Sequence, residues 1–127
     1  MTDRPPDRIH IRDLTFRCII GIYEEERRNK QDVVVNLTLD ADLSRPGKTD
    51  DIADTIDYKS IKKQVLAMGE RSSFFLVERL AQRIADICLE HDGVRRVRVL
   101  VEKPSALRFA RTVGVEIVRD RRDSSEP

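Results

Sequence analysis

The spacing of apolar residues changes along this chain, and that change constrains the fold more than any other feature of the sequence. Near the N-terminus, apolar and polar residues alternate, which is the two-residue period of a half-buried β-strand. The first alternating segment runs from Ile9 to Ile20, and a shift of phase between Ile11 and Leu14 predicts a β-bulge. A second segment, Val33–Ala41, pairs with it in a long predicted antiparallel hairpin.

The middle of the chain has helical spacing instead. The loop Tyr23–Gln31 closes the hairpin, and the polar segment Ser44–Asp54 contains Pro46-Gly47 as a turn signal. A first helix is then predicted over Tyr58–Met68. A second is predicted from Phe74 to about Glu90.

The second helix has clear signals at both ends. Ser72 or Ser73 is its predicted N-cap, and Gly93 suits a left-handed exit after it. Its apolar residues fall in one narrow stripe, which consists of Val77, Leu80, Ala81, Ile84 and Cys88.

Two more alternating segments, Val97–Val101 and Val113–Ile117, complete the order ββααββ. This order predicts the α+β class, with an antiparallel four-stranded sheet and both helices on one face. One helix layer leaves the sheet edges open, and segments such as Val33-Val34-Val35 place apolar residues on both faces. We therefore expect subunits to associate and close their sheets into a barrel.

The chain is short enough to be one domain over residues 1–127. Its ordered core is expected over about residues 8–119. The polar, proline-containing or charged ends, residues 1–7 and 120–127, are expected to be flexible tails.

Charge and composition exclude several kinds of protein. Lys and Arg total 24 against 23 Asp and Glu, so the basic excess of a nucleic-acid-binding protein is missing. No apolar stretch approaches the roughly 20 residues that span a bilayer, and the N-terminus lacks the apolar region of a signal peptide. We expect no nucleic-acid or membrane partner and a cytoplasmic location.

The sequence also offers no convincing metal site. Cys18 and Cys88 lie within apolar patterns, which is typical of buried, reduced thiols. His10 and His91 are the only histidines, so no ligand set for zinc is recognisable. We expect neither a metal nor a cofactor.

Four features could carry chemistry, although each also has a more ordinary explanation. Glu78 lies at the margin of the apolar stripe, where a carboxylate is usually half solvated but can accept two parallel N–H bonds. Lys103 ends the third strand, usually as an exposed cation, and could reach a site there. Tyr58 opens the first helix, where a tyrosine is most often an amphipathic anchor. Glu24–Glu26 would ordinarily be a solvated charge cluster.

Taken together, these positions fall in motifs that resemble the dihydroneopterin aldolase family. The motifs are Ile19–Glu26, Asn29–Asp32, Asp50-Asp51 through Asp57-Tyr58, Phe75–Ala81 and Glu102–Ala106. The resemblance covers about residues 9–119. It implies the tunnelling fold, in which ββααββ subunits join into a ring-shaped barrel, two rings stack as a homo-octamer, and the active sites lie between subunits.

The resemblance also implies roles for individual residues. Glu78 would bind the 2-amino and N3 edge of a pterin, with the backbone of Val77 beside it. Lys103 would be the catalytic lysine, and Tyr58 would exchange protons with the substrate side chain across a subunit boundary. Glu26 would approach the side-chain hydroxyls. An ordinary lysine is protonated at neutral pH, so Lys103 could act as a base only after giving up that proton.

The implied activity is that of a metal-independent carbon–carbon lyase in folate biosynthesis. The enzyme would cleave 7,8-dihydroneopterin into 6-hydroxymethyl-7,8-dihydropterin and glycolaldehyde by a retro-aldol reaction. The electrons left at C1′ would enter the C6=N5 bond of the pterin ring, so that neither a Schiff base nor a metal is required.

Some details resemble the sister branch, the dihydroneopterin triphosphate 2′-epimerases. They are Glu24–Glu26, Asn29–Asp32 and Ala106–Ala110. Epimerisation uses the same cleavage, followed by re-addition of the aldehyde on its other face, and Arg108 or Arg111 could serve a triphosphate. We favour the aldolase, with the epimerase as the alternative.

Two further alternatives belong to other classes. A non-catalytic ring that binds a pterin or purine would keep Glu78 but would have no use for Lys103 and Tyr58. A zinc-dependent cyclohydrolase of the same fold would need a Cys/His ligand set that this sequence lacks. The sequence leaves open a tetrameric ring or an octamer, the stereochemistry of the substrate and the pathway that receives the product.

Overall fold

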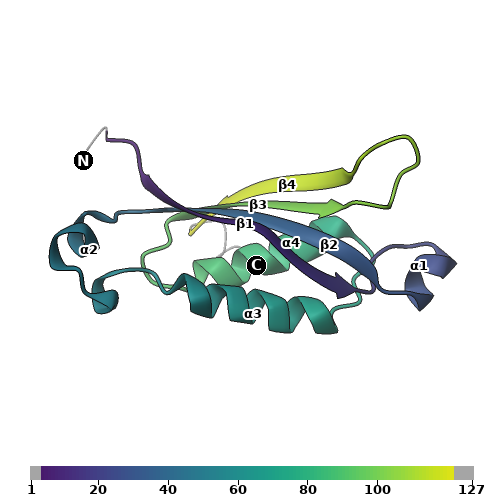
Figure 1. Ribbon diagram of the computed structural model, residues 1–127, viewed down its shortest axis with the longest axis horizontal. Helices are drawn as coiled ribbons and strands as arrows, with labels where there is room; N and C mark the ends of the chain where they lie inside the picture. The colour runs from purple at the N-terminus through teal and green to yellow at the C-terminus, as the bar shows by residue number, and fades with distance from the viewer. Residues whose placement is uncertain (1–3, 122–127) are drawn as a thin grey trace.

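A computed structural model of the chain describes residues 4–121. The elements are β1 (Asp7–Cys18), α1 (Glu24–Arg28), β2 (Gln31–Ala41), α2 (Ser44–Thr49), the 3₁₀ helix η1 (Ile52–Asp54), α3 (Tyr58–Arg71), α4 (Val77–Leu89), β3 (Arg96–Lys103) and β4 (Val113–Asp120). The strands and long helices follow the predicted order ββααββ (Figure 1). The short helical segments α1, α2 and η1 were not predicted.

The four strands form one antiparallel sheet in the order β1-β2-β3-β4. The pairing of β1 with β2 shifts register between Ile11 and Leu14, which confirms the predicted bulge. Asp13 in the bulge adopts φ 56°, and its N–H donates to the side-chain oxygen of Asn36 at 3.0 Å. The donor that the ladder leaves unpaired is therefore satisfied by a side chain.

Helices α3 and α4 cover one face of this sheet, as predicted (Figure 1). The fully buried side chains between the two layers include Val33, Val35, Leu37, Leu39, Ile61, Val65, Leu80, Ile84, Val97, Val99 and Val101. Burying one Val or Leu side chain stabilises a fold by roughly 1.5–3 kcal/mol. The alternation of buried positions along β3 and along β2 up to Leu39 therefore determines which face of the sheet meets the helices.

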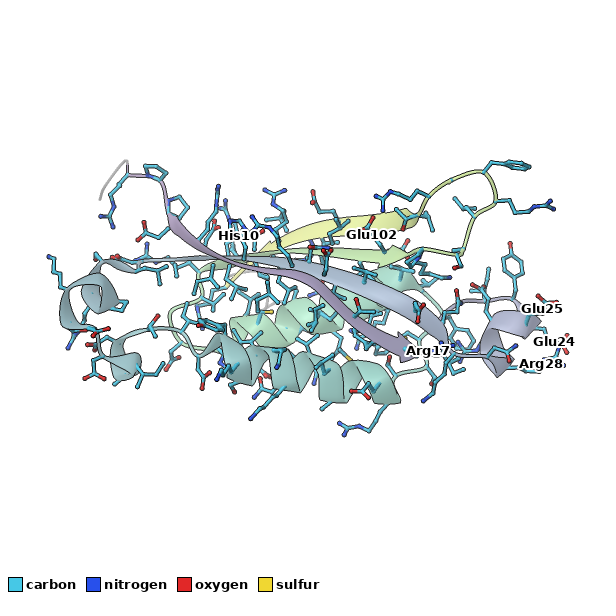
Figure 2. The ribbon with its side chains drawn as sticks, viewed as in Figure 1. His10, Arg17, Glu24, Glu25, Arg28 and Glu102 are labelled. Carbon is cyan, nitrogen blue, oxygen red and sulfur yellow. The ribbon has the colours of Figure 1, made fainter. Side chains whose placement is uncertain are left out.

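The opposite face of the sheet is mostly polar. His10 Nδ1 lies 3.3 Å from Thr38 Oγ1, and Arg98 forms an ion pair with Glu116 at 3.2 Å; His10 is labelled on this face in Figure 2. The prediction of apolar residues on both faces, made from Val33-Val34-Val35, is therefore wrong for most of the sheet. If copies of the chain associate, the parts of the sheet that need covering are the edge strands β1 and β4 and not an apolar second face.

The segment after β2 contains more structure than the predicted turn. Helix α2 includes both Pro46 and Gly47 and ends at Asp50, which adopts the left-handed conformation with φ 54°. Pro46 is tolerated because it is the third residue of the helix, where a main-chain N–H has no acceptor within the helix. Asp51 then caps η1 by accepting a hydrogen bond from the N–H of Ala53 at 3.0 Å.

The two long helices also differ from their predicted boundaries. Helix α3 continues to Arg71, and the hydroxyl of Ser72 donates to the carbonyl of Gly69 at 2.7 Å. Ser72 thus caps the end of α3 and not the start of α4, which begins at Val77 with Leu76 as its N-cap. A serine between two helices can serve either end, and the sequence did not distinguish them.

The ends of the sheet extend into both predicted tails. Asp7 opens β1 and accepts a hydrogen bond from the N–H of Leu43 at 2.8 Å, while Asp120 pairs with Arg96 at the end of β4. Asp7 and Asp120, which the sequence placed in the tails, are therefore the outermost residues of the sheet. The remaining parts, residues 1–3 and 122–127, lie outside the described residues.

Other predictions about single residues are confirmed. Gly93 adopts φ 94° after α4, and both Cys18 and Cys88 are buried, free thiols. Burial raises the pKa of Cys88 to about 12, so this thiol stays protonated at neutral pH. Within residues 4–121, none of the helices combines the length and the apolar character that crossing a membrane requires.

Candidate functional site

Lys103, the last residue of β3, has an almost completely buried side chain. Strand alternation places it on the same face as Val99 and Val101, toward the helices, and only 9% of its side chain is exposed. The ordinary explanation of Lys103 as an exposed strand end is therefore wrong. An ammonium group buried to this extent needs an anionic partner.

Glu26 of α1 is that partner. The Lys103 Nζ donates to Glu26 Oε2 at 2.7 Å, and 21% of the Glu26 side chain is exposed. Gln31 Nε2 donates to the same oxygen at 3.1 Å, and the N–H of Tyr23 donates to Oε1 at 3.3 Å. The hydrogen bond from Lys103 is the largest cause of the lowered pKa of Glu26; burial opposes it, and the other two donors add to it. Glu26 is therefore an ionised carboxylate with three donors at neutral pH.

The neighbours of Glu26 on α1 behave differently. Glu24, Glu25 and Arg28 point into solvent at the end of the molecule (Figure 2). Arg28 and Glu24 form only an exposed ion pair at 3.6 Å. The expectation of a solvated charge cluster thus holds for Glu24 and Glu25, whereas Glu26 turns toward β3.

The space for the Glu26 carboxylate exists because position 21 has no side chain. Gly21 adopts φ 131°, which favours glycine, and a Cβ there would overlap the Glu26 carboxyl group. Gln31 supports the same arrangement because its Nε2 also donates to the carbonyl of Ile20 at 2.7 Å. In the sequence, Gly21 and Gln31 stood out only as parts of longer motifs. A glycine that interrupts an alternating strand was the signal that could have identified one of them.

Cys18, the last residue of β1, is buried near Lys103. Burial raises the pKa of its thiol, and this effect is partly opposed by a hydrogen bond with Ser72 and by the positive charge of Lys103. A buried, protonated thiol is a poor nucleophile. Within residues 4–121, the structure brings together no group of three His, Cys, Asp or Glu side chains that could hold a metal ion.

The start of α4 lies at the same end of the molecule as α1, which contains Glu26, and the end of β3, which is Lys103 (Figure 1). A hydrogen bond of 3.2 Å from the N–H of Gly21 to the carbonyl of Phe74 connects the two regions. Val77 and Glu78 are the first residues of α4, where main-chain N–H groups have no acceptor within the helix. The side chain of Glu78 is exposed, so this turn offers both N–H donors and a carboxylate acceptor to a ligand.

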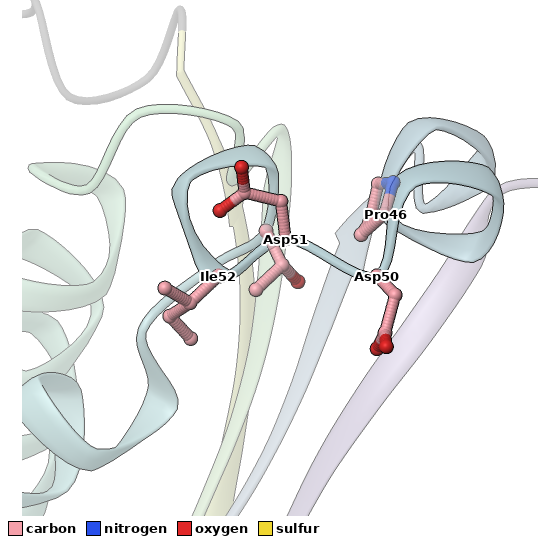
Figure 3. Close-up of a pocket in the computed structure, with 5 residues that line it drawn as sticks. Pro46, Asp50, Asp51 and Ile52 are labelled. Carbon is pink, nitrogen blue, oxygen red and sulfur yellow. The ribbon is translucent and has the colours of Figure 1, made fainter.

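Tyr58 is separated from this cluster within one chain. It is the first residue of α3 and is 53% exposed. The start of α3 lies at the opposite end of the molecule from the end of β3, where Lys103 is (Figure 1). A pocket of about 260 Å³ at this end is lined by Ile52, Ile56, Asp57, Tyr58 and Lys59. A second pocket, of about 290 Å³, is lined by Pro46, Asp50, Asp51, Ile52 and Thr55 (Figure 3). Ile52 lines both, so the two pockets adjoin.

A comparison with protein families matches residues 9–118 to FolB, dihydroneopterin aldolase. The chain belongs to the dihydroneopterin aldolase family. This confirms the resemblance seen in the sequence motifs, and it makes the chain a member of an enzyme family whose named activity is that of a lyase.

Relatives within the dihydroneopterin aldolase family carry two different names. The chain is 40% identical to the dihydroneopterin triphosphate 2′-epimerase of Pseudomonas aeruginosa, over 90% of this chain and 93% of the relative. It is 39% identical to the dihydroneopterin aldolase of Streptomyces coelicolor, over 79% of this chain and 84% of the relative. Identity alone therefore does not separate the two branches.

Longer relatives and solved structures extend the comparison. The chain is 39% identical to the folic acid synthesis protein FOL1 of Dictyostelium discoideum over 89% of its own length, and it spans 17% of that relative. It also superimposes on the crystal structure of E. coli dihydroneopterin aldolase in complex with neopterin. That match has a TM-score of 0.85 and 33% identity, and covers 89% of this chain and 98% of the other.

Proposed function

We propose that this protein is a dihydroneopterin aldolase that cleaves 7,8-dihydroneopterin into 6-hydroxymethyl-7,8-dihydropterin and glycolaldehyde, a step of folate biosynthesis. The observation that carries this proposal is the buried Lys103–Glu26 pair beside the start of α4, in a chain of the aldolase family. The pair is a candidate for proton transfer, and the helix start is a candidate for binding the ring. A ring that only binds a pterin would not need a buried lysine at this place.

The start of α4 fits the edge of an aminopterin. The Glu78 carboxylate can accept parallel hydrogen bonds from the 2-amino group and N3–H, and the N–H of Val77 can donate to a ring oxygen or nitrogen. The positive end of a 13-residue helix favours an electronegative atom there. These contacts would hold the substrate so that its side chain extends toward Lys103, and orientation of this kind contributes to catalysis.

The reaction begins when the proton of the 2′-hydroxyl is removed. The C1′–C2′ bond then breaks, C2′ and C3′ leave as glycolaldehyde, and the electron pair at C1′ is delocalised into the C6=N5 bond as an enamine. Reprotonation at C1′ gives the hydroxymethyl product. The substrate ring accepts the electrons, so the chemistry needs no Schiff base, metal or cofactor.

Three residues would move or hold the protons. Lys103 would donate and recover a proton through its ammonium group. Glu26 accepts a hydrogen bond from that group and would face the side-chain hydroxyls of the substrate. Tyr58 would exchange a proton with the substrate side chain from a second copy of the chain. General acid–base steps of this kind contribute roughly 10²–10⁴-fold each.

A complete site would therefore require a homo-oligomer. Within one chain, α1 and the end of β3, with Glu26 and Lys103, lie at one end of the molecule, and the start of α3, with Tyr58, lies at the other. Neighbouring copies arranged head to tail would therefore bring these residues together. Pairing of the edge strands β1 and β4 between copies would close the sheets into the barrel of a tunnelling fold, as a tetrameric ring or an octamer of two rings.

The epimerase activity is the second candidate, because the Pseudomonas aeruginosa relative that is 40% identical to this chain carries the epimerase name. The same cleavage would release the C2′–C3′ aldehyde, and attack of C1′ of the enamine on the other face of that aldehyde would re-form the C1′–C2′ bond. The C2′ centre would then be inverted without net release of the aldehyde. The two activities differ in how long the aldehyde is retained and in whether a triphosphate is accepted.

Product analysis tests this proposal directly. The purified protein is incubated with 7,8-dihydroneopterin and, separately, with its triphosphate, and chromatography follows the hydroxymethyl product and the 2′-epimer. Rapid hydroxymethyl product from the free triol supports the aldolase, whereas epimer formed without cleavage, faster on the triphosphate, supports the epimerase. Neither product, together with retained pterin binding, would reject both. A parallel reaction with a chelator tests metal independence, for which unchanged turnover is expected.

A further inference from the structure

Arg27, the residue after Glu26 on α1, connects two segments that are far apart in the sequence. Its Nη1 donates to the carbonyls of Gly21 and Phe74, each at 3.0 Å, and its Nη2 donates to the carbonyl of Ser73 at 2.7 Å. The guanidinium carbon also lies 4.1 Å from the centre of the Phe75 ring. One side chain thus binds the loop before α1 and the segment before α4 at the same time.

Helix α1 depends on side-chain anchors such as Arg27 and Glu26 because it packs no residue into the core. It has five residues and none of them is buried, and an isolated helix of this length is unstable in water. Consecutive helical residues point about 100° apart. Glu26 can therefore turn toward Lys103 while Arg27 turns toward Ser73 and Phe74.

The segment that Arg27 binds leads directly into the proposed pterin site. Residues 72–76 connect α3 to α4, and Val77 and Glu78 follow them. Two carbonyls of this segment, those of Ser73 and Phe74, accept hydrogen bonds from the guanidinium group. The Phe74 carbonyl also accepts from the N–H of Gly21. Arg27 therefore donates two of the three hydrogen bonds described here between the α1 region and the segment that leads into α4.

We propose that Arg27 is a positioning residue that sets Glu26 against Lys103 and, through the Ser73 and Phe74 carbonyls, sets the start of α4 against this pair. The kinetic consequences of this role rest on the proposed function, whereas the effect of Arg27 on the positions of Glu26 and the α4 start does not. Charge alone would not suffice, because a planar fork of N–H donors is needed to reach several carbonyls at once while stacking on an aromatic ring.

The test compares Arg27→Met and Arg27→Lys with Arg28→Met and Arg28→Lys. Arg28 lies on the same short helix, and its only described ion pair is the exposed one with Glu24, so its variants control for charge and helix propensity. Misplacement of reacting groups by about 1 Å can cost roughly 10²-fold. We expect kcat/KM to fall about 10²-fold in Arg27→Met and nearly as far in Arg27→Lys, with lower kcat and higher KM together. The Arg28 variants should stay within about twofold.

The pH profile supplies a readout that loss of stability alone would not change. Glu26 is faced by Lys103 from β3, by the neutral Gln31 from β2 and by the N–H of Tyr23, and Cys18 of β1 lies behind Lys103. If Glu26 moves away from Lys103, its pKa rises toward the ordinary glutamate value. The acidic limb of kcat/KM should then shift to higher pH in the Arg27 variants and stay in place in the Arg28 variants.

Two measurements do not depend on turnover. Fluorescence titration gives the Kd for neopterin, which should increase at least about tenfold in Arg27→Met, because the α4 start is displaced. A crystal structure of Arg27→Met should show the Lys103 Nζ to Glu26 Oε2 distance lengthened from 2.7 Å beyond hydrogen-bonding range. Far-UV circular dichroism and the melting temperature establish that each variant is folded, and Arg27→Lys replaces Arg27→Met if the latter is not.

The outcomes separate this inference from the proposed function. If the wild-type protein turns over and the Arg27 variants match the Arg28 variants in kcat/KM, acidic limb and Kd, the positioning role is wrong and the aldolase assignment stands. If the wild-type protein yields no product, the assignment fails, and the Kd and the Lys103–Glu26 distance decide the positioning role alone. Unchanged values of both would overturn it.

Discussion

Lys103 and Glu26 are 77 positions apart in the chain, yet their side chains form an ion pair with a distance of 2.7 Å between Nζ and Oε2. Each ion is largely buried, so each is stabilised by the other, and removal of one partner leaves a charge in a poorly solvated place. Variants that test this pair should therefore keep the shape of the side chain while removing its charge.

Lys103→Met is such a variant. We expect kcat to fall by about 10²–10⁴-fold, because the proton carrier is lost, while the Kd for neopterin changes by less than about threefold, since Val77 and Glu78 hold the ring. Steady-state kinetics and a fluorescence titration measure the two effects, and Lys62→Met, on an exposed position of α3, is the matched control. Normal turnover by Lys103→Met would contradict the proposed mechanism.

Glu26 should make stability depend on pH in a predictable direction. Its pKa is lowered in the folded chain, so the paired carboxylate stabilises the fold above the ordinary glutamate pKa, about 4.3. This stabilisation is lost as the pH falls through the lowered pKa, because the folded chain then also takes up the proton. We expect wild type to exceed Glu26→Gln by about 1–2 kcal/mol at pH 7, and by progressively less from about pH 5 to pH 3.

Urea denaturation of wild type and Glu26→Gln, both at the same protein concentration, measures this difference in the free energy of unfolding across the pH range. A difference that stays constant down to pH 3 would show that the Glu26 carboxylate is not stabilised by its partners.

Gly21→Ala should damage the site by two routes. Alanine at φ 131° is strained by about 1–3 kcal/mol, and its methyl group would displace the Glu26 carboxyl group. We expect a lower melting temperature and a large loss of kcat/KM. Gly47→Ala is the control, because no atom lies within 4 Å of the added Cβ in α2 and alanine favours a helix. Equal effects of the two changes would contradict this account.

At the scale of elements, α3 approaches β1 closely because residue 69 is a glycine. A Cβ at Gly69 would lie within 2.9 Å of ring carbons of Phe16. We expect Gly69→Ala to destabilise the fold by about 1–3 kcal/mol through overpacking, although alanine favours a helix more than glycine does.

A double-mutant cycle with Phe16→Leu tests this cause. The cost of Gly69→Ala should be smaller in the Phe16→Leu background, because the clash is with the aromatic ring. If the two substitutions have additive effects on the free energy of unfolding in urea, the clash with the Phe16 ring is not the cause of the destabilisation.

At the scale of the whole molecule, the two halves of the proposed site lie at opposite ends of one chain. Exposed apolar side chains occur at both ends: Ile22, Tyr23, Phe75 and Leu76 at one, and Ile52 and Tyr58 at the other. A head-to-tail interface of this kind generates a ring when the rotation between copies closes.

Subunit mixing tests the shared site. Lys103→Met and Tyr58→Phe are each expected to be nearly inactive as pure proteins. After unfolding and refolding as an equal mixture, about a quarter of the sites should combine an intact Lys103 with an intact Tyr58 from the neighbouring copy, so activity should return to about that fraction of wild type. Sedimentation confirms that mixed oligomers have formed. If mixed oligomers form without any recovery, Lys103 and Tyr58 do not serve one site from two chains.

The sequence by itself determined the order of strands and long helices, the bulge between Ile11 and Leu14, and the buried face of β2 and β3. These features follow from local periodicity, because the side chains of a strand or helix repeat with the geometry of the backbone. The same alternation places the side chain of Lys103 on the buried face of β3, although a single lysine before a proline gives no local sign of burial.

Only the tertiary structure decided which helix Ser72 caps, that Glu26 and not Glu24 or Glu25 turns inward, and that Arg27 bridges to Ser73 and Phe74. In each case the neighbouring residues in the sequence allow more than one arrangement of the side chain. The choice between them depends on which distant segment packs alongside, and that is set by the burial of the whole sheet against α3 and α4 rather than by neighbours in the sequence.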